Sequence, residues 1–290
     1  MRTVSVVTVV GARPQFVKAA AIRRAIDAHN ASSAEVRIDE KLLHTGQHYD
    51  AGLSQVFFDE LGIPSPAINL DVGSDTHGRQ TAGMLAGIEE FLEAERPDAL
   101  IVLGDTNSTL AGALAAAKMH IPVAHVEAGL RTVLMRTPES VNRVVADCVS
   151  KWLFCPTRSA VENLRREDVT EGVHFVGDVM YDSLLAHQTM LRKLPAGEVP
   201  DAAAGDYHLA TIHRAENADS PDRLASILAA LGELDRPVVL PLHPRTRAAL
   251  DACGFAIRGN LSAIEPVSYA RMLALEQGAR VILTDSGGVQ

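Results

Sequence analysis

Short apolar runs alternate along the chain with longer segments that have the composition and periodicity of helices. Glycine or polar residues end most of the runs, as they do at turns. This alternation predicts an α/β fold in which helices connect parallel strands. We expect strands over residues 4–10, 36–43, 101–103, 122–126, 152–155, 173–176, 207–211, 237–240, 262–264 and 281–283. We expect helices over residues 16–29, 54–61, 79–94, 109–119, 138–150, 157–166, 182–194, 222–234, 246–252 and 269–277.

The segment 195–205 separates two series of these units. It is rich in Pro, Gly and Ala and has no apolar periodicity, so we place a domain boundary there. The prediction is two Rossmann-like domains, residues 1–195 and 196–290, with a ligand cleft between them. The last residues, 284–290, form a glycine turn that should open a helix. They predict a second domain that is truncated at its C-terminus.

The stretch 101–132 places an acidic residue directly after each of two successive predicted strands. Asp105 follows the first strand and Glu127 follows the second. Parallel strands with right-handed crossovers have their carboxyl ends at one edge of the sheet, where open α/β sheets bind ligands. Two carboxylates at that edge indicate a functional site.

The first predicted strand is followed by a glycine turn and the N-terminus of a helix. Backbone N–H groups at such a terminus can bind an anion, and Arg13 and Lys18 add positive charge there. The alternative is an ordinary strand-to-helix turn with basic residues on its surface. The motif alone does not separate the two interpretations.

Two further polar segments each carry two interpretations. His44 and His48 have the spacing of metal ligands on a helix, but Gly46 between them favours a loop. We therefore expect this loop to contact a ligand rather than a metal. Glu139 follows Pro138 at the start of a predicted helix. One interpretation is that its negative charge interacts with the helix dipole and has no further role.

The balance of charged residues limits which classes of partner the protein can bind. The 27 Lys and Arg residues against 36 Asp and Glu residues give a net charge of −9. That balance disfavours a general nucleic-acid or anionic-membrane surface but allows a local cationic pocket. The three cysteines show neither metal-ligand spacing nor a disulfide framework. The apolar stretch at the N-terminus is too short to span a membrane, so we expect a cytoplasmic enzyme.

Several motifs occur in an order that is typical of one family. They are GARPQFVKAA, HTGQHYD, GDTNSTLAG, HVEAGLRT, PESVNR, GDVMYDS, TIHRAEN, LHPRT and LTDSGGVQ. In this order they resemble the non-hydrolysing UDP-N-acetylglucosamine 2-epimerase family over essentially the whole chain. The residues of the motifs GARPQF, HRAEN and LHPRT resemble more closely those of a branch that acts on UDP-2,3-diacetamido-2,3-dideoxy-glucuronic acid.

The resemblance implies two domains of the glycosyltransferase-B type. The nucleotide would bind mostly to the C-terminal domain, and the sugar would face the N-terminal one. The implied reaction inverts C2 and converts UDP-GlcNAc to UDP-ManNAc by elimination of UDP to a 2-acetamidoglycal and re-addition. It needs neither a metal nor a nicotinamide cofactor, and it supplies precursors of surface polysaccharides. The resemblance also implies a homodimer.

Site residues are implied by matching each motif to the family. Asp105, Glu127 and Glu139 would supply carboxylates, Arg143 would lie near them, and His213 would assist the departure of UDP. Arg13, Lys18 and the turn 286–288 would meet phosphate. Gln47, His48 and His243 match a second, regulatory UDP-sugar site that some members have. The full set implied to bind substrate is Arg13, Lys18, Gln47, His48, Arg143, His243, Ser286, Gly287 and Gly288.

The chain departs from the family pattern at two places. Ser140 stands where many members have a second Glu, which changes the charge beside Glu139. Members also continue past Gln290 with a helix that contacts the ribose of the nucleotide. We therefore expect this chain to bind UDP weakly and to turn over slowly, and micromolar UDP binding in calorimetry would contradict that expectation.

Two alternatives to a non-hydrolysing epimerase stay open. One is a glycosyltransferase or a hydrolysing epimerase, because fold alone does not separate these enzymes. The other is a truncated UDP-sugar-binding module without catalysis. The missing segment favours the module, whereas the presence of all four implied catalytic residues argues against it.

Overall fold

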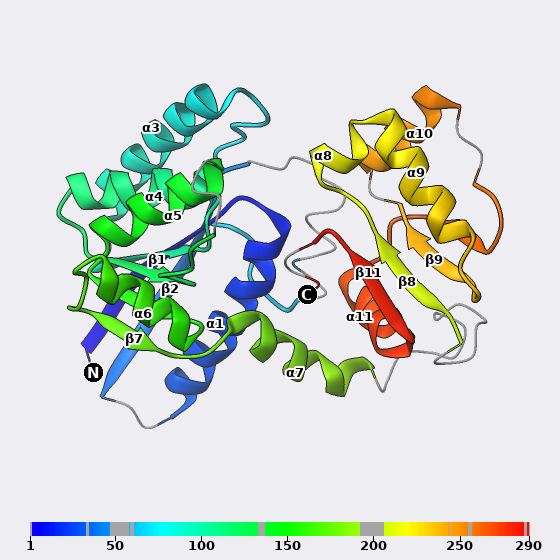
Figure 1. Cartoon of the computed structure of the whole chain (residues 1–290). Coiled ribbons are helices and arrows are strands. Elements are labelled where there is room, and N and C mark those ends of the chain that lie inside the picture. Colours follow the sequence, from blue (N-terminus) through cyan, green and yellow to red (C-terminus); the bar gives the residue numbers. More distant parts are fainter. Residues whose placement is uncertain are drawn as a thin grey trace. The chain divides into compact units, whose positions relative to one another are not determined.

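The computed structural model describes residues 2–32, 35–46, 58, 61–132, 137–191, 206–242, 244–254, 257–286 and 289. The chain divides into two compact units, Met1–Ser183 and Leu184–Gln290. Each unit is an α/β structure with a parallel sheet, as the sequence predicts (Figure 1). The expected boundary between residues 195 and 196 lies outside the described residues, as does most of the helix expected over 54–61.

Parallel pairing connects all neighbouring strands in the first unit. The strands lie in the order β3-β2-β1-β4-β5-β6-β7, which is the Rossmann order with one further strand. The direction of sheet building reverses between β1 and β4, and open α/β sheets bind ligands at such a switch point. The strands are β1 (Arg2–Val10), β2 (Val36–His44), β3 (Ile68–Asn69), β4 (Ala99–Leu103), β5 (Val123–Val126), β6 (Trp152–Cys155) and β7 (Val173–Phe175).

Helices cover the sheet of the first unit. Helices α3, α4 and α5 pack side by side (Figure 1), and α1 packs against β1 and β2. The core between α3, α4 and the sheet consists mostly of aliphatic side chains, including Val9, Ile88, Leu100, Val102 and Ala113. The helices are α1 (Arg13–Ala31), α3 (His77–Glu95), α4 (Asn107–Lys118), α5 (Pro138–Val149), α6 (Arg158–Arg166) and α7 (Val179–Leu191).

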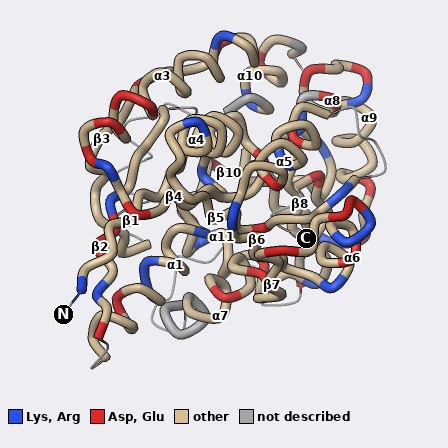
Figure 2. Tube along the Cα trace, turned by 90° about the vertical axis from the view of Figure 1, so that its left-hand side faces the viewer, with Lys and Arg blue, Asp and Glu red and all other residues tan. Residues whose placement is uncertain are grey.

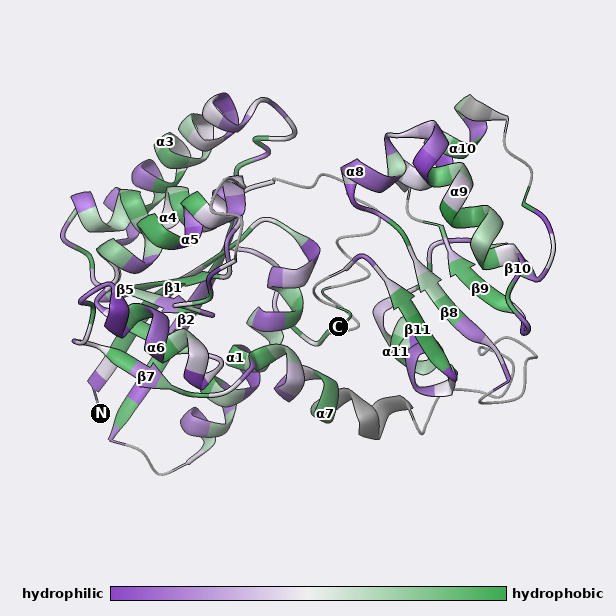
Figure 3. Cartoon of the chain, viewed as in Figure 1, coloured by the Kyte–Doolittle hydropathy of each residue, from purple (hydrophilic) through white to green (hydrophobic). Residues whose placement is uncertain are grey.

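The second unit contains a sheet of four strands in the order β10-β9-β8-β11. Strands β9 and β11 are mostly hydrophobic along their length (Figure 3). The strands are β8 (His208–Thr211), β9 (Val238–Pro241), β10 (Leu261–Ile264) and β11 (Val281–Thr284). The helices are α8 (Ala215–Ala218), α9 (Pro221–Gly232), α10 (Pro244–Cys253) and α11 (Tyr269–Gly278).

Most of the strands and helices expected from the sequence are confirmed to within three residues at each end. Two short elements were not predicted: the two-residue strand β3 and the single-turn helix α8. Helix α1 begins three residues earlier than expected, at Arg13. Pro14 does not oppose this start, because proline is tolerated in the first turn of a helix.

Lys, Arg, Asp and Glu side chains are distributed along the helices and loops, whereas the central strands β4 and β5 carry none of these four residue types (Figure 2). Within the described ranges, no helix is both long and apolar enough to cross a membrane.

Gly172 provides a test of the turn that precedes β7. Its φ is +69°, and a Cβ at this position would lie 2.0 Å from the carbonyl oxygen of Lys151. Gly62 has a similar φ of +64° but open space around the Cβ position. A left-handed conformation costs a non-glycine residue about 1–2 kcal/mol, and overpacking adds about 1–3 kcal/mol.

We therefore expect Gly172→Ala to lower the free energy of unfolding by about 2–5 kcal/mol, and Gly62→Ala by only about 1–2 kcal/mol. The single tryptophan, Trp152, lies in this unit on β6, so its fluorescence during urea unfolding measures the change. Equal losses in the two variants would show that the contact with Lys151 does not restrict the turn.

Candidate active site

The loops after β1, β4 and β5 meet at the carboxyl edge of the first sheet. They bring together four charged side chains from separate elements: Lys18 on α1, Asp105 after β4, Glu127 after β5, and Arg143 on α5. Because β1 and β4 flank the switch point of the sheet, this cluster lies where the topology favours a ligand site. The parallel pairing of β4 with β5 places Asp105 and Glu127 at one edge, as the strand pattern predicts.

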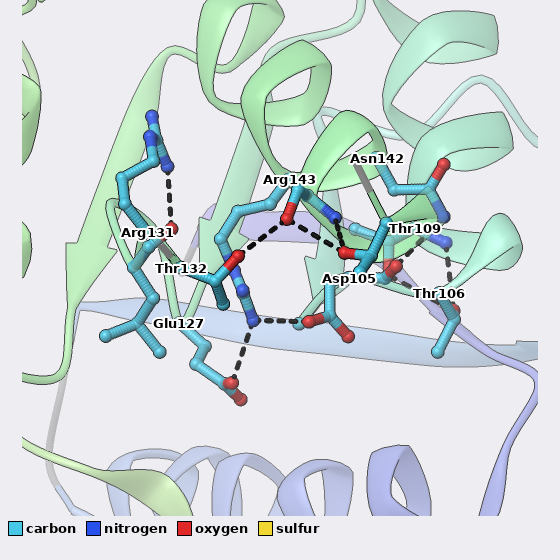
Figure 4. Close-up of polar contacts among 12 residues, drawn as sticks. Asp105, Thr106, Thr109, Glu127, Arg131, Thr132, Asn142 and Arg143 are labelled. Carbon is cyan, nitrogen blue, oxygen red and sulfur yellow. Dashed lines mark hydrogen bonds and ion pairs between the residues drawn. The ribbon is translucent and has the colours of Figure 1, made fainter. Parts of the chain in front are cut away.

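Arg143 is shared between the two carboxylates (Figure 4). Its Nη2 lies 2.6 Å from Asp105 Oδ2 and 3.3 Å from Glu127 Oε1. Lys18 Nζ makes a second ion pair with Glu127 Oε2. The Arg143 and Lys18 side chains are only 7% and 10% exposed, so the charges are weakly screened and strongly coupled. The cluster therefore contains two cations and two carboxylates in contact.

The backbone at Glu127 adopts a conformation that is rare for a residue with a side chain. Its φ is +73°, and such positions cost about 1–3 kcal/mol unless the surroundings hold them. The N–H groups of Glu127 and Ala128 both donate to the carbonyl of Phe154, at 3.0 and 3.1 Å. Strain of this kind is concentrated at functional sites, and here it occurs at a residue whose carboxylate pairs with Lys18 and Arg143.

The loop that carries Asp105 is held on both sides. Gly104 has a φ of +67°, and a Cβ there would lie 3.0 Å from Lys18 Nζ. The Asn142 side chain donates to the carbonyl of Asp105 at 2.9 Å. Thr106 then caps α4 by accepting the N–H of Thr109 at 3.3 Å. Hydrogen bonds therefore hold the backbone at Asp105 and the start of the helix that follows it.

Asp105 has a raised pKa. Burial of its carboxyl is the largest cause, and the nearby cation of Arg143 opposes it. The negative charges of Glu127 and Glu139 raise this pKa further. A carboxyl group with a raised pKa can exchange protons closer to neutral pH than an ordinary aspartate.

Glu139 lies in the first turn of α5 and is exposed. Its effect on the pKa of Asp105 shows that it is electrostatically coupled to the cluster. The helix-dipole interpretation of Glu139 also fits its position, because α5 begins at Pro138. The two interpretations are therefore compatible.

The N-terminus of α1 is arranged differently from the sequence-based expectation. The side chain of Gln15 accepts the N–H groups of Gly11 and Ala12, at 2.8 and 3.1 Å, and donates to the carbonyl of Leu103 at 2.8 Å. Two backbone donors that were expected to face an anion are thus already used. Arg13 is the first residue of α1. A contact between its side chain and phosphate is still a prediction.

The loop that was expected to contact a ligand is described only at its start. His44 Nδ1 lies 2.8 Å from Asn69 Oδ1, and its ring packs against Phe16 and Phe58. Gln47 and His48 lie outside the described residues, as do His243, Gly287 and Gly288. Within the described part of the chain, no three His, Cys, Asp or Glu side chains are grouped so that they could hold a metal.

In the second unit, Asp285 organises the loop that carries His213. Its carboxylate accepts the N–H groups of His213 and Arg214 at 3.1 and 3.0 Å, and the side chain of Asn217 at 3.0 Å. Burial alone would raise the pKa of Asp285, but these hydrogen bonds outweigh it and lower the pKa. His213 Nδ1 lies 3.1 Å from this ionised carboxylate, so Nδ1 carries a hydrogen. The predicted phosphate residue Ser286 donates its N–H to Thr284 Oγ1 at 2.9 Å.

Several polar residues that support the cluster were not singled out in the sequence. They are Gln15, His125, Arg131, Asn142 and Asp147. For those on a helix or strand, the signal is a polar side chain inside an otherwise apolar run or helix face, which indicates a buried hydrogen-bonding partner. Arg131 lies in the loop after β5 and has no such signal.

Comparisons with known proteins agree with the motif pattern. The family model for UDP-N-acetylglucosamine 2-epimerase matches residues 30–290. A UDP-2,3-diacetamido-2,3-dideoxy-D-glucuronate 2-epimerase from Pseudomonas aeruginosa is 46% identical over 291 residues, covering 98% of this chain and 79% of that protein. A UDP-N-acetylglucosamine 2-epimerase homolog from Methanococcus maripaludis shows the same identity and coverage.

A solved structure with the same fold is the Methanocaldococcus jannaschii UDP-GlcNAc 2-epimerase in complex with UDP-GlcNAc and UDP. It superimposes with a TM-score of 0.87 at 40% identity, covering 99% of this chain and 80% of that one. The comparison covers both units, and therefore both the charged cluster and the His213 loop.

Proposed function

Because the chain belongs to the UDP-N-acetylglucosamine 2-epimerase family, we propose that it inverts C2 of a UDP-2-acetamido sugar without hydrolysis. The two candidate substrates are UDP-GlcNAc, which would give UDP-ManNAc, and UDP-2,3-diacetamido-2,3-dideoxy-glucuronic acid. The observation that carries the proposal is the pair of carboxylates, Asp105 and Glu127, that shares Arg143 at the switch point of the first sheet.

The chemistry requires an acid–base set. The C2 proton has no adjacent carbonyl to make it acidic, so its removal must be coupled to departure of UDP. A base takes the C2 proton, the C2–H electrons form the C1–C2 double bond, and the C1–O bond breaks towards the diphosphate. Proton return to the opposite face of C2 and re-addition of UDP at C1 give the epimer. Such a sequence needs groups that exchange protons and cations for the developing charge.

Asp105 is the residue we assign to proton transfer at C2. Its raised pKa suits proton exchange, and a single cation, Arg143, pairs with it. Glu127 contacts two cations, Lys18 and Arg143, which supports a role in fixing the cluster and balancing its charge. Glu139 completes the set as a carboxylate that is coupled to Asp105.

His213 is the group we assign to departure of UDP. Its ring lies 3.1 Å from the Asp285 carboxylate, and imidazole is the side chain that most often exchanges protons near neutral pH. A protonated imidazole can donate a proton to a leaving phosphate. Lys18, Arg13 and Ser286 are proposed to meet the diphosphate, and Arg143 to neutralise the reacting carboxylates.

Substrate choice rests on an experiment, because relatives named for each substrate are equally similar to this chain. The protein is incubated separately with UDP-GlcNAc and with UDP-2,3-diacetamido-2,3-dideoxy-glucuronic acid, and products are followed by proton NMR. We expect the manno epimer with intact UDP from at least one of them. Free UDP with free sugar would instead indicate hydrolysis, and no product from either would indicate a binding role. That the protein forms a homodimer is a prediction, which light scattering tests. A cytoplasmic location is also a prediction.

The pH dependence of the reaction tests the pairing of Arg143 with Asp105. A base must be ionised, so kcat/KM should fall as the pH decreases through the raised pKa of Asp105. Arg143 lowers that pKa. Arg143→Gln should therefore move the acid limb of the pH profile to higher pH, whereas Arg143→Lys, which keeps the charge, should move it less. An acid limb at the same pH in both variants would contradict the assignment.

A further inference from the structure

A chain of polar and charged side chains, buried at His125 and Asp147 and exposed at its far end, connects to the loops after β4 and β5. His125 on β5 has no exposed surface. Its Nδ1 lies 2.7 Å from Asp147 Oδ1, and its Nε2 lies 2.7 Å from the carbonyl oxygen of Gly104. Asp147 on α5 also pairs with Arg131 at 2.7 Å, and Arg131 continues to Glu167 at 2.6 Å. None of these four residues belongs to the proposed acid–base set.

Both ring nitrogens of His125 face hydrogen-bond acceptors. The Gly104 carbonyl can only accept, so Nε2 must donate to it. The Arg131 guanidinium lies 2.7 Å from Asp147 Oδ2 and favours the ionised carboxylate independently of His125, and the pKa of Asp147 is lowered despite burial. An ionised Asp147 also only accepts, so Nδ1 must donate as well. A ring that donates from both nitrogens is an imidazolium, and bonds of 2.7 Å are typical of charge-assisted pairs.

The two acceptors of His125 are connected to the two loops of the site. Gly104 directly precedes Asp105 in the chain. Asp147 accepts the N–H of Gly129 at 3.1 Å, two residues after Glu127. Gly104, Glu127 and Gly129 all have positive φ, at +67°, +73° and +76°. Only Glu127 is strained by this conformation, since glycine adopts it readily. The bonds of His125 to Gly104 and of Asp147 to Gly129 hold the backbone on either side of the two acidic residues.

We propose that His125, as a buried imidazolium paired with Asp147, is a positioning residue that sets the loops of Asp105 and Glu127 relative to each other. The positioning of the two loops is a property of the fold, and its effect on turnover rests on the proposed epimerase function. No substrate contact is assigned to His125, since it is fully buried. A side chain that acts through loop geometry should affect kcat far more than KM, because small misplacements of reacting groups cost about 10²-fold in rate.

The first test measures the charge state in the wild-type protein. Nitrogen-15 NMR of the histidine side chains at pH 7.5, with the His125 signal assigned by its loss in His125→Gln, should show two protonated ring nitrogens. An unperturbed histidine is mostly neutral at this pH, because its pKa is about 6.5. A His125 signal with one protonated nitrogen would overturn the proposal.

The second test measures the loops. His125→Phe keeps a ring but removes both donors, and His174→Phe is the matched control on the exposed edge strand β7. We expect His125→Phe alone to speed amide hydrogen exchange in 104–107 and 127–130, with α6 as the internal reference. We also expect it to lower kcat about 10²-fold with KM within about threefold. Unchanged exchange in both loops would overturn the proposal. Faster exchange in a protein whose wild type epimerises neither sugar would support the positioning and refute only the enzymatic function.

Discussion

Asp105→Asn should lower kcat for C2 epimerisation by about 10³-fold, within the range for loss of a general acid or base. Asparagine has nearly the same shape and can still accept a bond from Arg143, which lies 2.6 Å from Asp105 Oδ2. It cannot take a proton from carbon. The loss should therefore appear in turnover, measured by NMR of the UDP-sugar, while calorimetric affinity for UDP stays within about threefold.

Asp98→Asn is the matched control for this variant. Asp98 lies at the other end of β4, where its carboxylate accepts the N–H of Ser5 at 2.8 Å. The two aspartates therefore flank one strand, and only Asp105 belongs to the cluster. Asp98→Asn should leave kcat within about twofold, since it lies about a strand's length from the site. Activity of Asp105→Asn close to that of Asp98→Asn would refute the assignment of proton transfer to Asp105.

Glu127→Gln should both inactivate and destabilise the protein. It leaves Lys18, whose side chain is 10% exposed, without the carboxylate with which it pairs. Removal of one partner of a buried pair costs about 3 kcal/mol or more. We expect a loss of that size in urea unfolding followed by Trp152 fluorescence, and a decrease in kcat of about 10²-fold or more.

A double variant separates the loss of stability from the loss of activity. Lys18→Met together with Glu127→Gln removes the unpaired charge, so it should regain about half of the lost stability or more. It should not regain activity, because the Glu127 carboxylate and the lysine that we propose to meet phosphate are both gone. The half-exposed pair Lys41–Glu95 is the control, and Glu95→Gln should cost no more than about 1 kcal/mol. Recovered activity in the double variant would show that Glu127 serves only to pair with Lys18.

The position of the site at the carboxyl edge of the first sheet could be predicted from sequence, because the polar residue after each apolar run marks where the strand ends. The apolar runs before Asp105 and Glu127 define β4 and β5, and parallel pairing then places both carboxylates at one edge. The predicted strands need only end at the correct residue for this inference to hold. The family resemblance implied only that Arg143 lies near the carboxylates, since an arginine on a helix has no sequence pattern of its own. Its position between Asp105 and Glu127 is a finding of the structure.

Other features depend on tertiary contacts that a linear pattern does not contain. Strand β3 is two residues long and is defined only by its pairing with β2. Helix α8 is a single turn that adjoins the N–H groups held by Asp285. Sequence patterns could not show that His125 joins Gly104 to Asp147, because a histidine within a strand is most often a core residue with satisfied bonds. The early start of α1 depends on Gln15, whose partners lie across the switch point.

Solvent deuterium provides the most direct measurement of the central claim that this protein inverts C2 by removing and returning a proton. The protein is incubated in deuterated water with UDP-GlcNAc or its diacetamido-uronate analogue, and C2 is observed by NMR and mass spectrometry. The account predicts a manno epimer that carries deuterium at C2 and an intact UDP group. An epimer that retains its original C2 hydrogen, or release of UDP and free sugar with no epimer, would contradict it.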